Sequence, residues 1–391
     1  MIRFDSVTKT YPDGTVAVDD LSLTAPSGKI TVLVGPSGCG KTTSVRMINR
    51  MIEPTSGRIW IDDRDHSTTS PTELRRGIGY VIQHAGLFPH RTIVDNVATV
   101  PLLLGQNRRE ARAKALELLE RVGLPASFAK RYPAQLSGGQ QQRVGVARAL
   151  AADPPVMLMD EPFSAVDPVV REQLQNEFLR LQSELSKTIV FVTHDIDEAI
   201  KLGDQVAVMR VGGKLAQLAT PADLLSNPVD DFVAGFVGRD RGYRALGFEP
   251  VPGLHLDPET TVFMGSDVSA AAAVARDGWV LVVDDHGWPQ GWLAVGDDAT
   301  RASLQITPPL LHRGGTVASV NGTFRSVLDA ALSSPTGRGV IVDDARRFAG
   351  TITAANVVRL LEQQQVAHQQ AAPVPASPLQ APVQGAGATP R

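Results

Sequence analysis

The stretch GPSGCGKT, residues 35–42, decides the fold of the first part of this chain. Its three glycines let the backbone turn so that successive N–H groups converge, and such a cradle binds phosphate. The β-branched run ITVLV precedes it at residues 30–34, and apolar residues at helical spacing follow it over residues 42–51. A strand, a glycine loop and a helix in this order predict a nucleotide site at the positive end of the helix.

The residue types in the glycine loop predict a different role for each of two side chains. The Lys41 ammonium supplies a mobile positive charge to the phosphate oxygens, and the Thr42 hydroxyl is a predicted Mg²⁺ ligand. The alternative is a plain turn between strand and helix, but the complete spacing and the flanking elements favour a phosphate site. The predicted nucleotide-binding residues here are Gly35, Pro36, Ser37, Gly38, Cys39, Gly40, Lys41, Thr42 and Thr43.

A second apolar run, residues 156–159, ends in the acidic pair Asp160 and Glu161. A buried strand that ends in two carboxylates places one where it can hold Mg²⁺ through water and the next where it can deprotonate attacking water. We assign Asp160 to the metal and Glu161 to general-base catalysis. An ordinary acidic strand end is the alternative, and the nearby glycine loop argues against it.

The stretch LSGGQ, residues 136–140, opens a predicted helix over residues 140–152. Ser137 and Gln140 fit a capping box, which needs no ligand. The consecutive glycines Gly138 and Gly139 cost helix stability, however, and a phosphate that approaches the backbone would explain them. All four residues are therefore predicted to contact nucleotide.

Three further polar or aromatic residues are candidates for the same site. His194 follows the apolar run 189–193, so it lies at the ligand side of a parallel sheet, where it could contact the γ-phosphate as a catalytic residue. Gln83 follows the run 79–82 and could contact Mg²⁺ and water. Tyr11 lies ahead of the glycine loop and either stacks on adenine or belongs to the core.

The order of elements indicates an α/β fold with a parallel sheet flanked by helices. Further helices are predicted at residues 108–122, 168–185 and 196–202, between apolar runs that also include 205–209. We expect a first domain over residues 1–237, a linker over 238–252 and a second α/β domain over 253–362. The second domain contains a repeat, since VVDD at 282–285 with Gly291 recurs as IVDD at 341–344 with Gly350. Residues 363–391 are rich in Ala, Gln and Pro and predict a disordered tail.

The bulk composition excludes several classes of protein. The formal net charge of −3 gives no electrostatic reason to expect nucleic acid as a partner. The single cysteine, Cys39, can build neither a disulfide framework nor a metal cage, which favours a reducing, cytosolic setting. Neither a signal peptide nor a long apolar span is evident, so work at a membrane would require docking onto another subunit.

The ordered set of motifs resembles the ATP-binding cassette (ABC) ATPases over about residues 1–235. The glycine loop, Gln83, the 136–140 stretch, Asp160 with Glu161, the SAVD stretch at 164–167 and His194 occur in the family's order. The resemblance implies a head-to-tail homodimer, in which MgATP lies between one subunit's glycine loop and the other's LSGGQ stretch. It also implies that Tyr11 stacks on adenine and that Asp167 communicates across the dimer.

Three longer sequence stretches resemble one subgroup of the ABC ATPases. MINRMIEPTSG at 47–57, GYVIQHAGLFPH at 79–90 and THDIDEA at 193–199 resemble the ATPases of bacterial importers for glycine betaine, choline, carnitine or proline. Such a subunit would lie at the cytoplasmic face of the membrane, bound to integral membrane permease subunits. An extracytoplasmic substrate-binding protein would deliver the solute to these permease subunits. The surface around residues 83–97, with its apolar LFP at 87–89, is the expected permease contact. The repeat in the second domain resembles a tandem pair of CBS modules.

The second domain departs from the pattern of CBS modules that bind adenosine compounds. Asn356 replaces the expected acid in one copy, and the other copy, which has Asp297, lacks the hydroxyl. The nearly neutral tail also gives no support to an ionic-strength sensor. Three functions stay open: an importer ATPase for an osmoprotectant or another small solute, a soluble ABC ATPase that acts on nucleic acid or ribosomes, and a ligand sensor centred on the CBS-like pair.

Overall fold

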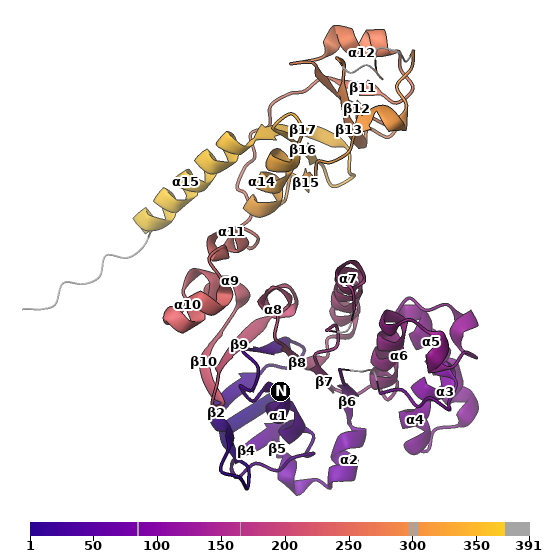
Figure 1. Cartoon of the computed structure of the whole chain (residues 1–391), viewed down its shortest axis with the longest axis vertical. Helices are drawn as coiled ribbons and strands as arrows, with labels where there is room; N and C mark the ends of the chain where they lie inside the picture. The colour runs from indigo at the N-terminus through magenta and orange to yellow at the C-terminus, as the bar shows by residue number, and fades with distance from the viewer. Residues whose placement is uncertain (84–85, 165, 297–299, 301–303, 372–391) are drawn as a thin grey trace, which may run out of the picture. The chain divides into compact units, whose positions relative to one another are not determined.

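The computed structural model describes residues 1–83, 86–164, 166–296, 300 and 304–371 (Figure 1). They form two compact units, the first from Met1 to Gly242 and the second from Tyr243 onward. Each unit has buried apolar clusters of its own. Among the helices of the described residues, none is both long and apolar enough to cross a bilayer.

A six-stranded sheet forms the centre of the first unit, in the order β10-β9-β3-β8-β7-β6. Its neighbours pair in parallel, except that β10 is antiparallel to β9. Strands β3, β7 and β8 are buried at every position, so they appear in the sequence as unbroken apolar runs, and the five predicted strands are confirmed. The sheet consists of β3 (Ile30–Val34), β6 (Ile78–Val81), β7 (Val156–Asp160), β8 (Thr188–Thr193), β9 (Gln205–Arg210) and β10 (Lys214–Ala219).

An antiparallel sheet, which the sequence analysis did not predict, precedes and follows the glycine loop in the chain. Its strand order is β2-β1-β4-β5, and shifts of register interrupt the β1–β2 ladder. Its buried side chains, such as Phe4 and Ile59, share one apolar core with residues of the central sheet. The strands are β1 (Ile2–Thr10), β2 (Val16–Ala25), β4 (Ser56–Ile61) and β5 (Arg64–Asp65).

Helices flank the central sheet, and those predicted from periodicity are present. Helices α7 and α8 have the predicted bounds, whereas α6 begins earlier than expected, at Gly138. Helices α3, α5 and α6 pack on one another, and α6 also contacts β6 at the end of the sheet (Figure 1). The helices are α1 (Lys41–Ile48), α2 (Pro71–Arg76), α3 (Ile93–Val97), α4 (Thr99–Leu103), α5 (Arg108–Arg121), α6 (Gly138–Leu150), α7 (Pro168–Leu185), α8 (Ile196–Leu202), α9 (Pro221–Ser226) and α10 (Asp231–Val237).

The second unit repeats one β-α-β-β pattern. In each copy the first strand pairs in parallel with the second, which pairs antiparallel with the third. Val282 lies opposite Gly291 and Ile341 lies opposite Gly350, with the same irregularity one residue later, so the predicted repeat is confirmed at the level of register. The copies are β11 (Thr261–Phe263), α12 (Val268–Val274), β12 (Trp279–Val283) and β13 (Pro289–Ala294), then β15 (Val317–Ser319), α14 (Phe324–Ser333), β16 (Arg338–Val342) and β17 (Phe348–Thr353); β14 (Leu311–His312) extends the first.

The structure differs from the expected boundaries at two places. The expected linker contains a short helix, α11 (Arg241–Ala245), and Val251 belongs to an apolar core of the second unit. Helix α15 (Ala354–Ala371) continues past residue 363, where a disordered tail was expected to begin. Ala, Leu and Gln favour helix, and Leu360 and Leu361 anchor its first half on that core. The remaining tail, 372–391, and Asp297 lie outside the described residues.

Candidate functional site

One pocket joins the glycine loop to the carboxyl ends of two other strands. The loop follows β3, Glu161 follows β7 and His194 follows β8, so parallel strand ends bring three distant segments to one edge of the sheet. Its walls come from the loop, from those two strand ends and from β2. The lining residues are Ala17, Ser37, Gly38, Cys39, Gly40, Lys41, Thr42, Thr43, Glu161 and His194.

The loop conformation depends on glycine at Gly35 and Gly40. Their φ angles are +156° and +91°, values that other residues rarely adopt. A Cβ atom at Gly40 would lie 2.2 Å from the Ala17 carbonyl oxygen, and one at Gly35 would lie 2.3 Å from the Met209 carbonyl oxygen. The loop therefore lies directly against the neighbouring strands β2 and β9, and a side chain at either position would displace it.

Lys41 is held inside the curve of this loop. Its Nζ donates hydrogen bonds to the carbonyl oxygens of Gly35 (2.8 Å) and Pro36 (3.0 Å), and the residue is only 6 % exposed. The ammonium group thus lies among backbone groups of the loop and next to the pocket. A positive charge in this position favours an anionic ligand.

Thr42 lines the pocket, and its side chain contacts Asp160, which is not among the lining residues. The Thr42 hydroxyl donates a hydrogen bond to Asp160 Oδ1 at 3.0 Å. Burial raises the pKa of the Asp160 carboxyl above its usual value, and the Thr42 hydroxyl partly offsets this effect. A hydroxyl and a carboxylate side by side are oxygen ligands of the kind that Mg²⁺ accepts. Because the described residues contain no group of three acidic, His or Cys side chains arranged to hold a metal ion, such an ion would need phosphate and water as its other ligands.

Glu161 and His194 form a pair in the lining of the pocket. His194 Nδ1 lies 3.1 Å from Glu161 Oε2, and the side chains are 61 % and 21 % exposed. The Glu161 backbone has a φ of +48°, uncommon for a residue with a side chain, and its N–H donates to the Val192 carbonyl. The backbone of β8 thus fixes the carboxylate beside the imidazole, and both groups face the space next to the glycine loop.

Gln83 reaches this pair only indirectly. Its Nε2 donates to Ser164 Oγ at 3.3 Å, and Ser164 Oγ donates to the Glu161 carbonyl at 2.9 Å. Gln83 is exposed and does not line the pocket. Its contact with Mg²⁺ and water remains a prediction.

The LSGGQ stretch lies outside the pocket and forms the start of α6. Ser137 Oγ accepts a hydrogen bond from the Gln140 N–H, and Gln140 Oε1 accepts one from the Ser137 N–H. The capping box predicted as the ligand-free alternative is therefore present. Gly139 has a packing reason as well, since a Cβ there would lie 3.0 Å from Val170 Cγ1. Neither observation tests the predicted phosphate contact of Ser137, Gly138, Gly139 and Gln140.

Tyr11 and Asp167 are also not among the pocket residues. Tyr11 lies in the β1–β2 turn, where the Lys9 ammonium is 5.5 Å from its ring centroid. Asp167 caps α7, since its Oδ1 accepts a hydrogen bond from the Val170 N–H. Their roles toward adenine and the dimer stay predictions. Sequence reasoning missed Ala17, which no motif marks and which lies on an unpredicted strand.

Comparison with known proteins agrees with this architecture. The family model described as ABC transporter matches residues 18–164. The chain is 42 % identical to the choline transport ATP-binding protein OpuBA of Bacillus subtilis (strain 168), covering 92 % of this chain and 96 % of that protein. It is also 42 % identical to the osmoprotectant import ATP-binding protein OsmV of Salmonella typhimurium (strain LT2), covering 90 % of this chain and 94 % of that one.

A solved structure extends the comparison to the fold. The ATP-binding cassette MJ0796, a dimer in a post-hydrolysis state bound to ADP and phosphate, superposes with a TM-score of 0.51 at 36 % identity. It covers 56 % of this chain and 99 % of that one. The parallel sheet, the glycine loop with its strand-end partners and the nearly full-length relatives lead to one conclusion. The chain belongs to the family of ABC transporter ATP-binding subunits.

Proposed function

We propose that this chain is the ATP-hydrolysing subunit of an importer for an osmoprotectant, either a quaternary amine such as glycine betaine, choline or carnitine, or proline. It acts as a homodimer at the cytoplasmic face of the membrane, bound to permease subunits. An extracytoplasmic binding protein delivers the solute to these permease subunits. The observation that carries the ATPase assignment is the pocket in which the glycine loop faces the Glu161–His194 pair. The solute class is supported by the names of relatives that match nearly the whole chain.

Several residues of the pocket, and Asp160 beside it, have chemical roles in this proposal. The loop N–H groups and the Lys41 ammonium bind the phosphates and stabilise charge on the transferring phosphoryl group. Glu161 orients attacking water and accepts its proton, while His194 donates a hydrogen bond to the γ-phosphate. Thr42 and Asp160, 3.0 Å apart, would hold the Mg²⁺ that accompanies ATP, directly and through water. Bound Mg²⁺ neutralises phosphate charge.

Two subunits complete each site in this proposal. Ser137 and the adjoining glycines lie outside the subunit's own pocket, so they are available to a nucleotide held by a second subunit. The start of α6 would add its N–H groups and positive dipole end to the γ-phosphate. The dimeric relative bound to ADP and phosphate supports this arrangement.

The permease contact is proposed for the surface that includes residues 86–89 and helix α4. Phe88 is 39 % exposed, and Leu103 and Leu104 are 59 % and 45 % exposed. The Gly86 carbonyl accepts a hydrogen bond from Arg148 Nη1 at 2.7 Å, which ties this surface to α6. A shift of α6 on nucleotide binding would therefore reach the permease.

We also propose that the repeated second unit is a tandem CBS-like domain that regulates transport. The two equivalent β-α-β-β copies support it, as does a cleft lined by residues of both copies, among them Trp292, His312 and Val340. If a chain that lacks residues 251–391 transports with unchanged osmotic regulation, the regulatory role is wrong.

The test of the main proposal is uptake of radiolabelled glycine betaine, choline, carnitine and proline. Cells with and without this chain are compared at low and high osmolarity. We expect uptake of at least one solute to require the chain and to rise at high osmolarity. If uptake of all four solutes is the same with and without the chain while its ATPase activity is intact, the solute class is wrong. Co-purification with ribosomes instead of a membrane protein would support the soluble alternative.

A further inference from the structure

Helix α7 connects two parts of the proposed ATPase that lie far apart in the sequence. Its first turn and the residues just before it pack on the start of α6, because a Cβ at Gly139 would lie 3.2 Å from Val166 Cγ1 and 3.0 Å from Val170 Cγ1. Asp167 caps α7 between these two valines. A displacement of the LSGGQ stretch therefore pushes directly on the start of α7.

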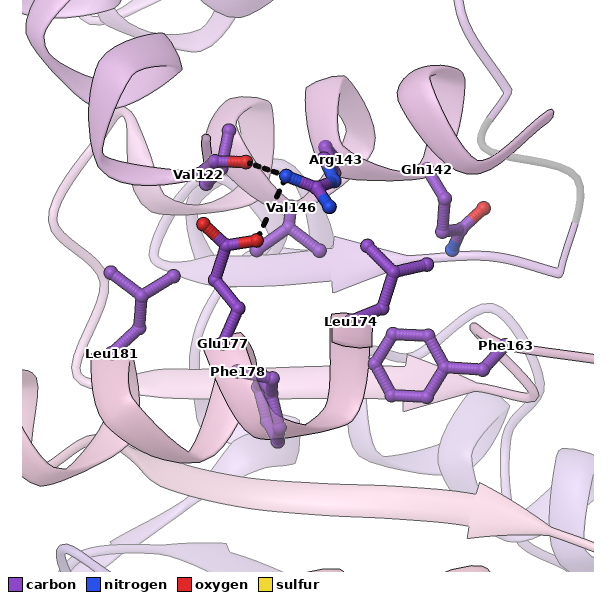
Figure 2. Close-up of a pocket in the computed structure, with 9 residues that line it drawn as sticks. All are labelled: Val122, Gln142, Arg143, Val146, Phe163, Leu174, Glu177, Phe178 and Leu181. Carbon is purple, nitrogen blue, oxygen red and sulfur yellow. Dashed lines mark hydrogen bonds and ion pairs between the residues drawn. The ribbon is translucent and has the colours of Figure 1, made fainter. Parts of the chain in front are cut away.

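The two helices are also joined further along. Arg143 of α6 and Glu177 of α7 form an ion pair of 2.9 Å, and each side chain is 21 % exposed. Figure 2 shows this pair beside an apolar crevice whose walls include Val146 and Leu174. Arg143 Nη1 also donates to the Val122 carbonyl at 3.1 Å (Figure 2). Because α6 and α7 are in contact both at their first turns and at the Arg143–Glu177 pair, we expect the two helices to move together.

Arg171 then links α7 to the loop that carries His194. Its Nη2 donates to the Val166 carbonyl at 3.1 Å, and its Nη1 lies 3.9 Å from Asp195 Oδ2. Asp195 follows His194 and caps α8, since its Oδ1 accepts from the Asp197 N–H at 2.9 Å. One planar guanidinium thus bridges the chain before α7 and the chain before α8.

A buried bond one turn further holds the same helices together. Gln175 Nε2 donates to Glu198 Oε1 at 3.0 Å, and both residues are only 6 % exposed. This bond holds α7 against α8 one turn away from Arg171. The line of contacts ends at His194, whose Nδ1 is 3.1 Å from Glu161.

We infer that Arg171 is a positioning residue that couples the LSGGQ end of α6 to His194 within one subunit. This inference rests on the proposed function, in which the LSGGQ stretch serves the partner's nucleotide while His194 serves the subunit's own. Binding at one site of the dimer would then alter the geometry of Glu161 and His194 at the other. Such coupling requires a shared element with two discrete arrangements, and binding at either nucleotide site must favour one of them. Helix α7 is the shared element in this inference.

The test uses the full-length chain and measures ATPase rate against ATP concentration. We expect wild-type protein to show positive cooperativity between its two sites. Arg171→Gln and Asp195→Asn should each lower the Hill coefficient toward 1 and lower kcat about tenfold, with affinity for a fluorescent ATP analogue changed less than twofold. Asn retains the cap of α8, so the second variant removes the charge and keeps the helix start.

Controls separate coupling from a structural role. The matched control is Arg180→Gln, which removes an exposed ion pair with Glu184 on the same helix and should leave the Hill coefficient unchanged. The double variant of Arg171 and Asp195 should be no worse than Arg171→Gln alone, because that substitution already removes the contact with Asp195. Cooperativity that survives in either single variant, or additive losses in the double variant, would overturn the inference. Wild-type protein that hydrolyses ATP without cooperativity would likewise overturn the inference, because its two sites would then be uncoupled, and would leave the proposed ATPase function standing.

Discussion

The Thr42 hydroxyl and the Asp160 carboxylate are hydrogen-bonded at 3.0 Å although 118 residues separate them in the chain. Asp160 ends a strand that is buried throughout, and the residue itself is 8 % exposed. A single hydroxyl does not replace the water that this carboxylate loses on folding, so its pKa is raised. The pair is therefore better suited to holding a cation than to stabilising the nucleotide-free fold.

The first prediction concerns this cost. A carboxyl whose folded pKa lies above its unfolded value favours unfolding at every pH above the folded pKa, and the effect vanishes below the unfolded value of 3.8. Asp160→Asn removes the buried charge and should raise the Tm of the nucleotide-free protein by a few degrees at pH 7. The gain should shrink as the pH falls through the folded pKa. The stabilisation by added MgATP should be largely lost.

Asp153 provides the control for this prediction, since its shift has the opposite sign. The Lys187 ammonium, 2.7 Å away, lowers the pKa of the Asp153 carboxyl, whose side chain is 69 % exposed. Asp153→Asn should leave the Tm at pH 7 unchanged or slightly lower and preserve the response to MgATP. A lower Tm for Asp160→Asn at pH 7 would contradict the interpretation.

The second prediction tests the general base. Glu161→Gln keeps the shape of the side chain beside His194 but cannot accept a proton from water. We expect ATP binding to be retained and kcat to fall by about 10²- to 10⁴-fold, the usual contribution of a general base. Glu184→Gln, which alters an exposed ion pair on α7, should retain full activity. If Glu161→Gln kept full activity in a steady-state ATPase assay, the base assignment would be wrong.

The third prediction separates backbone strain from close contact. Gly14 and Gly40 both have left-handed backbones, with φ of +86° and +91°. A Cβ at Gly14 would meet nothing within 4 Å, whereas one at Gly40 would lie 2.2 Å from the Ala17 carbonyl. Gly14→Ala should therefore cost about 1 kcal/mol of stability and leave ATP binding intact. Gly40→Ala should in addition displace the loop and abolish measurable ATP binding in a fluorescence titration.

The sequence allowed five of the six strands of the central sheet to be predicted because they are largely buried, whereas the partly exposed edge strand β10 was not predicted. Strands β3 and β8 are buried at every position and lack the regular alternation of polar and apolar residues, so their bounds were expected within a residue or two. The antiparallel sheet was missed for the converse reason. Strands β1 and β2 mix buried and exposed positions, and their register shifts break the period of two.

The residues of the candidate site could be predicted from the sequence only where they follow a buried strand. Glu161 and His194 could be predicted because each directly follows a buried strand, and parallel strand ends meet at one edge. Ala17 could not, because its contribution comes from the backbone position of an unpredicted strand. Arg171 carries no motif of its own, and only the three-dimensional contacts with Val166 and Asp195 distinguish it from other helix-surface arginines.

The last prediction concerns the proposed permease surface. Leu103, at the end of α4, is 59 % exposed, and an exposed leucine contributes little to the stability of the isolated subunit. Leu103→Asp should leave the ATPase activity of the purified chain within twofold and reduce solute uptake in cells at least tenfold, because a charge in an apolar contact is costly. Val211→Asp is the matched control: Val211 is 69 % exposed after β9, away from α4 in the sequence, and the change should not affect uptake. Equal uptake by the Leu103 variant and the wild type would exclude this part of α4 from the contact, whereas loss of ATPase activity in the purified variant would show that Leu103 supports the fold instead.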